Sequence, residues 1–241
     1  MKMRHLKTIV SVLAFLSVIS CSKNVVDESG KVTFQIAADQ FVADQTKSNV
    51  SDYTALPAAD DFTITIKDAS SSKVWSGKIS EWDESTQLVS GNYTVTAEYG
   101  DAAEEGFDKP YFAGAADFAI VGGETKSVSV SVSLANTVVK ISCSDDFVNY
   151  YSDYGFKITR TGAEIVSFPK GETRAAFLDG YMFVLEGTIA GKSFSREFSN
   201  LDAATAYTIL FDVSNVGGST ISITFKNETV PVELGDYELN D

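Results

Sequence analysis

Hydrophobic and polar residues alternate along most of the chain after residue 28. The clearest example is the run Val128, Val130, Val132 and Leu134, whose members are separated by serines. Because successive side chains of a strand point to opposite faces, this period of two predicts a strand with one buried face. After Cys21, no window longer than about eight residues favours a helix.

The same alternation, or a short apolar run between turn residues, predicts many further strands. They are expected at Val32–Ile36, Phe62–Ile66, Lys73–Ser76, Tyr93–Tyr99, Phe118–Val121, Val138–Cys143, Gly155–Arg160, Thr173–Phe177, Tyr181–Ile189, Lys192–Phe198, Ala206–Val213 and Thr220–Phe225. Ala190-Gly191 and Gly217-Gly218 are plausible hairpin turns. A single helical turn is expected at Ile79–Glu84.

Short strands separated by turns at roughly 8–12-residue spacing indicate β-sandwiches. The pattern restarts after Ala135-Asn136, which we interpret as a domain joint. The expected fold is all-β, with two Ig-like or transthyretin-like β-sandwich domains in tandem. The domains are expected at residues 31–135 and 136–241, since a sandwich of this kind takes roughly 100 residues.

Residues 1–20 have the features of a signal peptide, with a basic start followed by an uncharged, mostly apolar run from Thr8 to Ser20. That run is too short for a membrane span, which needs about 20 residues. The sequence Val18-Ile19-Ser20-Cys21 resembles the lipobox of bacterial lipoproteins, in which the cysteine thiol receives the lipid. Lipidation is therefore expected at Cys21, with residues 21–30 as a tether. The alternative is an ordinary secretory signal with a chance cysteine.

The mature chain is strongly acidic. Removing residues 1–20 takes away three basic residues and leaves 16 basic and 33 acidic residues. This charge disfavours nucleic acid, whose phosphates it would repel, and it disfavours adsorption to anionic lipid head groups. The expected membrane link is therefore the lipid at Cys21, because two or more acyl chains, such as palmitate, anchor a protein stably.

Catalysis by the usual groups is disfavoured. The only histidine, His5, lies in the signal peptide, so the mature chain lacks the common general base and every histidine-based metal site. With Cys21 lipidated, Cys143 has no disulfide partner and is expected to be a small buried residue. The acidic pairs Asp60-Asp61 and Asp145-Asp146 lack calcium-loop spacing and fit turn capping better. No enzyme activity, metal or cofactor is expected.

The loop from Gly100 to Gly114 concentrates aromatic and acidic residues, and two interpretations are open. The side chains of Phe107, Asp108 and Tyr111, with Phe112, suit sugar recognition, because rings stack on sugars and carboxylates accept hydrogen bonds from hydroxyl groups. Alternatively they close the end of the sandwich, with Asp108 capping a turn. We expect Phe112 to be buried and Tyr111 to be partly exposed, since a phenol tolerates water better than a phenyl ring.

A second aromatic stretch contains Tyr150 and Tyr151, between Phe147 and Phe156. Part of this stretch must belong to the core. Tyrosines on a connecting segment could equally form a contact patch for a ligand or partner.

Several motifs resemble a family of Bacteroidota cell-envelope lipoproteins that contain a domain of unknown function. They are Phe62-Thr-Ile-Thr-Ile, Gly91-Asn-Tyr-Thr-Val-Thr-Ala, Gly106-Phe-Asp-Lys-Pro-Tyr-Phe-Ala-Gly114 and Leu134-Ala-Asn136, in this order. The resemblance implies a two-domain β-sandwich lipoprotein and assigns no catalytic residue.

The architecture is also similar to that of fimbrillin-type pilins and adhesins, which lose an N-terminal strand to a trypsin-like protease and polymerise by strand exchange. This chain departs from that pattern. It has no arginine between Arg4 and Arg160, and the loop after its first strand offers only Lys47.

We therefore expect a lipid-anchored protein of the outer membrane with a non-enzymatic binding or adhesion role. The alternatives are a structural subunit of a fimbria-like assembly and a glycan-binding lipoprotein. The partner is expected to be a glycan or a protein. The sequence leaves open whether the periplasmic or the surface face holds the protein, and which oligomeric state it adopts.

Overall fold

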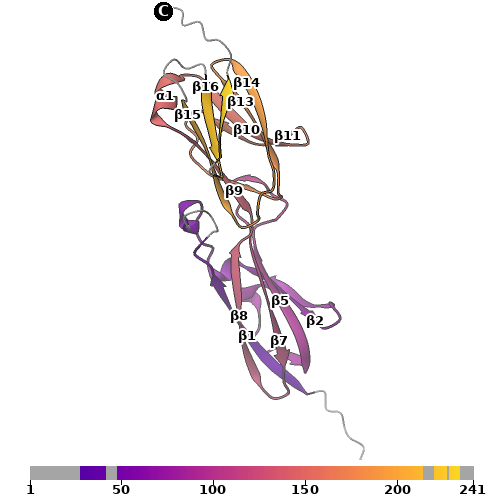
Figure 1. The fold of residues 1–241 in the computed structure, drawn as a ribbon. Coiled ribbons are helices and arrows are strands. Elements are labelled where there is room, and N and C mark those ends of the chain that lie inside the picture. The colour runs from indigo at the N-terminus through magenta and orange to yellow at the C-terminus, as the bar shows by residue number, and fades with distance from the viewer. Residues whose placement is uncertain (1–27, 42–47, 214–219, 227, 234–241) are drawn as a thin grey trace, which may run out of the picture.

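The computed structural model describes residues 28–41, 48–213, 220–226 and 228–233. Two β-sandwich domains lie end to end along one long axis, as Figure 1 shows. The chain enters the first domain at the pole farthest from the second domain. Within the described residues, no helix is long and apolar enough to cross a membrane.

The N-terminal domain is built on one bent, seven-stranded sheet with the order β3-β2-β5-β7-β8-β1-β4. Its strands are β1 (Ser29–Ala38), β2 (Thr63–Asp68), β3 (Lys73–Lys78), β4 (Gln87–Val89), β5 (Gly91–Tyr99), β7 (Phe112–Ile120) and β8 (Thr125–Leu134). Short 3-10 turns occur at Val50–Asp52, Ala59–Asp61 and Ile79–Glu81.

The C-terminal domain packs a four-stranded sheet against a six-stranded one. The first has the order β11-β10-β13-β14 and the second β17-β16-β15-β9-β12-β6. The elements are β6 (Gly106–Phe107), β9 (Thr137–Cys143), α1 (Asp145–Tyr150), β10 (Tyr154–Arg160), β11 (Ala163–Pro169), β12 (Ala176–Leu178), β13 (Phe183–Ile189), β14 (Lys192–Phe198), β15 (Ala206–Val213), β16 (Thr220–Phe225) and β17 (Glu228–Glu233).

The two domains repeat one topology. In each domain, the first strand pairs in parallel with a strand from late in the same domain. These pairs are β1 with β8 and β9 with β15. On its other side, the first strand pairs antiparallel with a short strand, β4 or β12. The opposing sheet is β3-β2-β5-β7 in one domain and β11-β10-β13-β14 in the other, with antiparallel pairing throughout. The expected pair of tandem β-sandwiches is therefore confirmed.

Alternation along the strands produces the cores. In β8, Val128, Val130, Val132 and Leu134 are buried, and the serines between them face outward or lie at the edge. Trp82 lies over the N-terminal core, where its indole Nε1 donates a hydrogen bond to the carbonyl of Val32 at 3.0 Å. The C-terminal core is aromatic, with Phe156 and Phe211 stacked at 4.3 Å between ring centroids.

Gly114 lets β7 lie against β8. A Cβ at this position would approach the Ser131 carbonyl oxygen to 1.9 Å, which no side chain tolerates. From this point the two strands diverge, since they pair only at Phe112↔Leu134 and Ala113↔Ser133. The close approach of β7 and β8 therefore depends on the missing side chain of Gly114.

Most expected strands are present, with some differences. β7 begins at Phe112, six residues before the expected Phe118, because residues 112–120 pair continuously with β5 although residues 113–117 show no apolar alternation. The alternation did not predict β4, β6, β11 or β17. Of the strand expected at Thr173–Phe177, only Ala176 and Phe177 belong to a strand, β12. The segment expected to connect strands after Cys143 contains the short helix α1, whose N-cap Ser144 accepts a hydrogen bond from the Phe147 backbone amide. The expected turn at Gly217-Gly218 lies outside the described residues.

Candidate functional site

The expected lipidation site, Cys21, lies outside the described residues, as do the expected signal peptide and Lys47. The expectations for these residues remain predictions. The described residues that precede the first sandwich begin at Glu28, beside β1 and β4, where the Glu28 carbonyl accepts a 2.7 Å hydrogen bond from the backbone amide of Ser90.

The aromatic loop between β5 and β7 crosses from the first domain to the second. Its centre forms β6, in which Gly106 and Phe107 pair antiparallel with Phe177 and Ala176 of β12. Gly106 has a φ of 122°, a conformation that favours glycine. Residues that sequence spacing assigns to the first domain thus supply the edge strand of the second domain's larger sheet.

A partly buried ion pair holds one side of β6. Arg160, at the end of β10, donates from Nη1 to the Glu105 carboxylate at 2.7 Å, with side chains 28% and 17% exposed. The second carboxylate oxygen of Glu105 accepts a hydrogen bond from the backbone amide of Asp179 at 2.7 Å. Reduced solvent strengthens such charge-assisted hydrogen bonds, so this pair fixes the loop against the second domain.

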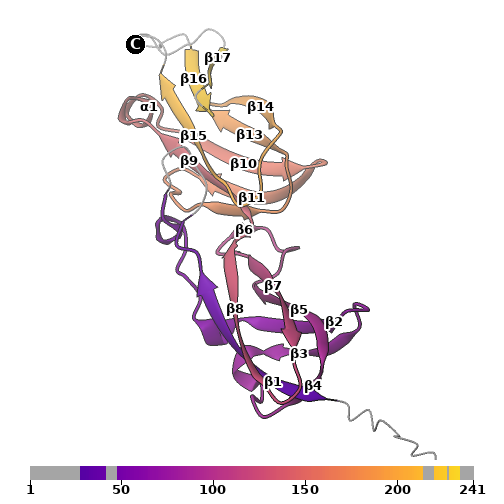
Figure 2. The same ribbon diagram turned by 60° about the horizontal axis from the view of Figure 1, so that its bottom comes forward.

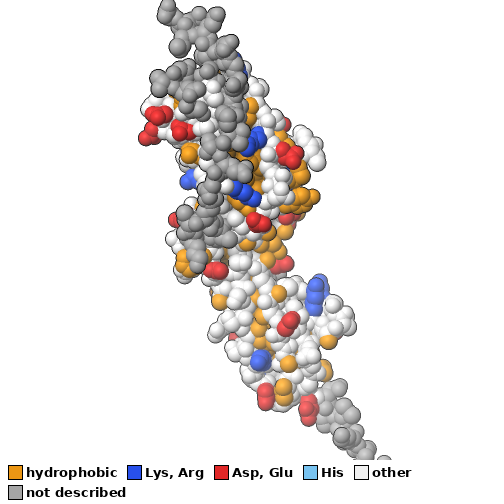
Figure 3. Space-filling model, viewed as in Figure 1, with side chains coloured by type: hydrophobic (Ala, Val, Ile, Leu, Met, Phe, Trp, Pro, Cys, Tyr) orange, Lys and Arg blue, Asp and Glu red, His pale blue; other side chains and the backbone are white. Residues whose placement is uncertain are grey.

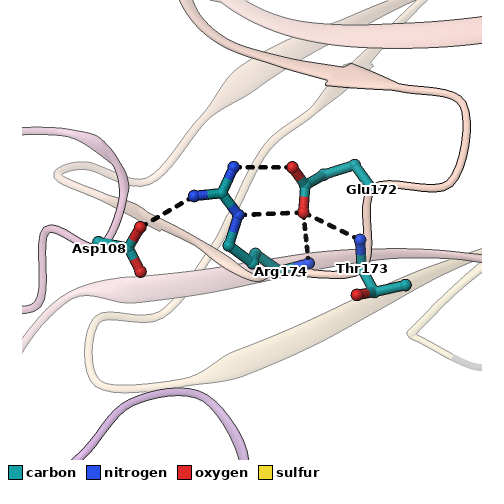
Figure 4. A network of polar contacts seen from close by, with 4 residues as sticks. All are labelled: Asp108, Glu172, Thr173 and Arg174. Atoms are coloured by element: carbon teal, nitrogen blue, oxygen red, sulfur yellow. Dashed lines mark hydrogen bonds and ion pairs between the residues drawn. The ribbon is translucent and has the colours of Figure 1, made fainter.

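A second group of polar contacts follows β6 in the chain and centres on Arg174, which Figure 4 shows with Asp108 and Glu172. The Arg174 guanidinium lies between two carboxylates, 2.9 Å from Asp108 and 2.8 Å from Glu172. Its side-chain hydrogen bond to Glu172 is the main cause that lowers the pKa of that carboxyl to about 2. The same guanidinium lies over the Phe107 ring at 4.3 Å, and Phe107 contacts Phe168 edge-on at 4.9 Å.

We call residues 104–109, with their partners in the second domain, the clasp. Within it Lys109 and Glu104 form an exposed ion pair at 2.6 Å. Phe107 and Asp108, expected as possible ligand contacts, are both engaged in contacts between the two domains in this structure. Sequence spacing missed the arginine partners because Arg160 and Arg174 lie 55 and 66 residues away from Glu105 and Asp108.

The other two candidates of this loop occupy different environments. Phe112 is 0% exposed in the first core, whereas Tyr111 is partly exposed, as expected. The Tyr111 hydroxyl donates to Glu98 at 3.2 Å, and burial of the ring raises the pKa of the phenol. Burial of Phe112 favours the closing role for this side chain, and a ligand role for Tyr111 remains a prediction.

The tyrosine pair lies at the end of α1. Tyr151 is 2% exposed and packs on Phe147, while Tyr150 is 39% exposed and contacts Tyr151 at 5.0 Å between ring centroids. Only Tyr150 thus presents a ring to solvent. On the face drawn in Figure 3, acidic side chains gather at this end of the domain, where Asp145 and Asp146 form the first turn of α1.

Sequence reasoning did not find a hollow of about 650 Å³ on the outer face of the four-stranded sheet. Half of its lining consists of glycine, serine and threonine residues, among them Gly155, Ser167, Thr188, Ser193 and Ser195, and Phe156, Phe168 and Phe194 add apolar surface. Cross-strand pairing brings these residues together, so no local signal marks them.

An exposed ion pair borders this hollow. Lys157 and Glu186 lie 3.0 Å apart, and their mutual hydrogen bond raises the pKa of the lysine and lowers that of the carboxyl. The hollow therefore offers hydroxyl groups and both signs of charge to a polar ligand.

No group of three or more metal-ligating side chains occurs among the described residues. Cys143, a free cysteine, is half-buried rather than buried, and desolvation raises the pKa of its thiol to about 11. A thiol with this pKa is almost wholly protonated at neutral pH and is a poor nucleophile.

The chain is similar to two solved fimbrial proteins. It matches a fimbrial assembly protein from Parabacteroides distasonis with a TM-score of 0.47 and 10% identity, over 72% of this chain and 91% of the other. It matches the fimbrial anchor protein Mfa2 from Porphyromonas gingivalis with a TM-score of 0.45 and 10% identity, over 83% and 98% of the two chains.

Among curated proteins, none matches this sequence. One family model does, and it spans residues 28–239, which include both sandwich domains. The resemblance drawn from the strand and loop motifs is confirmed by this match, and the chain belongs to the family described as domain of unknown function (DUF4493).

Proposed function

We propose that this protein is a lipid-anchored cell-envelope protein that presents its C-terminal sandwich as a non-enzymatic binding or adhesion module. The observation that carries the proposal is the clasp. It joins the two domains end to end through strand pairing, two groups of ion pairs and a ring contact. A joint of this kind suits a protein that holds a binding domain at a distance from its anchor.

The position of Glu28 at the pole of the first domain supports the anchoring part of the proposal. Cys21 precedes Glu28 by seven residues. A chain of that length reaches at most about 25 Å when fully extended. Anchoring at Cys21 would therefore keep the pole formed by β1 and β4 close to the membrane and direct the second domain away from it (Figure 1).

The outer hollow of the second domain is the best candidate for the binding surface. Its serine and threonine hydroxyls and the Lys157–Glu186 pair can exchange hydrogen bonds with a hydroxyl-rich ligand such as a glycan. Lys157 and Glu186 are engaged with each other in an ion pair that keeps both groups charged, so the surface suits binding rather than turnover.

Two measurements test the proposal. Detergent-phase partitioning and fatty-acid labelling should detect a lipid on the wild-type protein and none on Cys21→Ser. A glycan array probed with residues 22–241 should give binding that Thr188→Trp abolishes by filling the hollow. The control Thr96→Trp, on the outer face of the first domain, should bind normally.

A lipid on Cys21→Ser would refute the anchor. If Thr188→Trp and Thr96→Trp bind equally well, the hollow is not the binding surface. If the soluble chain binds no glycan at millimolar concentration, the partner is not a glycan.

A fimbria-like subunit is the second candidate, because β1 is an N-terminal strand inserted between β8 and β4. In a chain that lacks β1, another strand would have to fill the places that the side chains of Val32 and Phe34 occupy in the core. Mass spectrometry of the native protein separates the two candidates. A mature chain that begins near Ser48 supports the subunit, and one that begins at Cys21 refutes it.

A further inference from the structure

The first and last strands of the N-terminal domain lie side by side and run in the same direction. β1 and β8 pair in parallel over eight residues, from Lys31↔Thr125 to Ala38↔Val132. Both run from the pole where the chain enters toward the junction with the second domain, as the two ribbon views show (Figures 1 and 2). The chain thus enters and leaves this domain at opposite ends of one strand pair.

This arrangement decides how a pulling force acts on the domain. A force between the start of the chain and the second domain pulls β1 toward its own start and β8 toward its own end. The two strands would have to slide past each other, so their evenly spaced hydrogen bonds share the load and must break together. Strands pulled apart at one end would instead lose the same bonds one at a time.

Further contacts hold β1 at the end where the load arrives. Its first residues pair with β4, from Ser29↔Val89 to Lys31↔Gln87. The Ser29 carbonyl accepts a hydrogen bond from the Gly123 amide at 2.9 Å, and the Lys31 amide donates one to Glu124 at 2.8 Å. The buried indole of Trp82 adds its hydrogen bond to the Val32 carbonyl. β1 is therefore held on both edges, and its buried side chains resist sliding.

We infer that β1 and β8 form a mechanical clamp, which gives the N-terminal domain resistance to force along the axis between its first strand and the second domain. The clasp transmits the same load across the junction. The inference rests on the proposed function only for the origin of the load, which would come from a membrane anchor on one side and a bound partner on the other.

Single-molecule pulling of residues 22–241 tests the clamp, with one handle at the N-terminus and Cys143→Ser in every variant. In the shear geometry the second handle is at Tyr181→Cys, an exposed position in the second domain near the junction. The neighbouring Gly180 carbonyl accepts a hydrogen bond from Thr137 at the start of β9. In the peeling geometry it is at Val121→Cys, an exposed position near the start of β8. We expect the N-terminal domain, identified by the length released, to rupture at a severalfold higher force in shear.

Two variants separate the clamp from overall stability in the shear geometry. Gln35→Pro removes a backbone amide on the edge of β1 that faces β8. The Lys31 amide lies on the same edge, since alternate amides of a strand point the same way. The Gln35 side chain is exposed, so the substitution leaves the core unchanged. The control Ile64→Val trims a buried side chain of β2, outside the strand pair. We expect Gln35→Pro to lower the rupture force strongly, and Ile64→Val to lower the unfolding temperature with little change in force.

Equal forces in the two geometries would overturn the inference, and this comparison stands even if Gln35→Pro fails to fold. An equal loss of force in Gln35→Pro and Ile64→Val would also overturn it. The pulled chain carries no lipid, so the outcome is independent of the anchoring test on Cys21.

Discussion

Tyr111 and Phe112 are neighbours in the sequence but differ in what their side chains contribute. The phenyl ring of Phe112 is wholly buried and contacts Tyr99 edge-on at 6.2 Å, whereas the Tyr111 phenol reaches Glu98 at the surface. Phe112→Ala should cost about 3–5 kcal/mol of unfolding free energy. Tyr111→Phe should cost at most about 1 kcal/mol, the value of one exposed hydrogen bond.

Chemical denaturation of the full mature chain measures both values. If Phe112→Ala unfolds at the wild-type denaturant concentration, the ring does not close the core. The loop would then become the first place to look for a ligand. A loss of binding in Tyr111→Phe without a loss of stability would support a ligand role for the phenol.

The carboxyl of Glu172 links stability to pH. Its pKa falls from 4.5 to about 2 in the folded protein, chiefly because of the side-chain hydrogen bond from Arg174. A lowered folded-state pKa means that the stabilisation is complete above about pH 4.5 and is lost as the pH falls toward 2. Glu172→Gln should therefore cost about 1 kcal/mol or less at pH 7, since solvent screens the half-exposed arginine.

The difference between wild type and Glu172→Gln in thermal melts should shrink steadily as the pH falls from about 4.5 toward 2. Arg174→Lys serves as a comparison, because lysine keeps the charge but loses the paired hydrogen bonds. A constant difference in stability across this pH range would show that the hydrogen bond between Glu172 and Arg174 does not contribute to the stability of the folded protein.

At the scale of single elements, the course of β7 depends on Gly114. A Cβ there would meet the Ser131 backbone, which cannot move aside cheaply because β8 also pairs with β1. Gly114→Ala should lower the melting temperature markedly. Gly155→Ala is the matched control, since a Cβ at that position meets only Phe168 O at 3.8 Å.

Calorimetry of the two alanine variants checks this prediction. A normal melting temperature for Gly114→Ala would mean that β7 and β8 can separate without cost. A strong effect of Gly155→Ala would instead point to a general intolerance of side chains on the sheets.

At the scale of the whole molecule, the clasp sets the relation of the two domains. Glu105→Ala removes the acceptor of both Arg160 and the Asp179 amide and leaves a partly buried arginine without its carboxylate. Asp108→Ala, in the more exposed group of the clasp, removes only one ion pair to Arg174. We expect Glu105→Ala to loosen the joint and Asp108→Ala to have a much smaller effect.

Small-angle X-ray scattering of the mature chain measures the result. Loosening should shorten the average end-to-end dimension and broaden its distribution in Glu105→Ala, while each domain keeps its own core. Unchanged scattering for Glu105→Ala would show that the joint is held without the Glu105–Arg160 pair, by the strand pairing of β6 and the contacts of Phe107 and Asp108.

Local patterns in the sequence were enough to predict most of the strands and, in the alternating ones, the buried face. The alternation in β1, β5 and β8 is a property of consecutive residues, and water selects the buried face wherever every second side chain is apolar. The restart of the pattern after Asn136 likewise follows from local signals, as does the split between Phe112 and Tyr111. For the same reason the hydrophobic run before Cys21 predicts an export signal, although those residues lie outside the described structure.

Long-range pairing decided the rest. Whether β1 lies beside β8, and in which direction, depends on partners 94 residues apart, and alternation is the same for parallel and antiparallel neighbours. The loop after β5 reads as a local aromatic cluster, yet β6 joins the other domain because Arg160 and Arg174 meet Glu105 and Asp108 there. The sequence determines which chemical groups the side chains carry. Which of these groups come into contact depends on the pairing of strands that lie far apart in the chain.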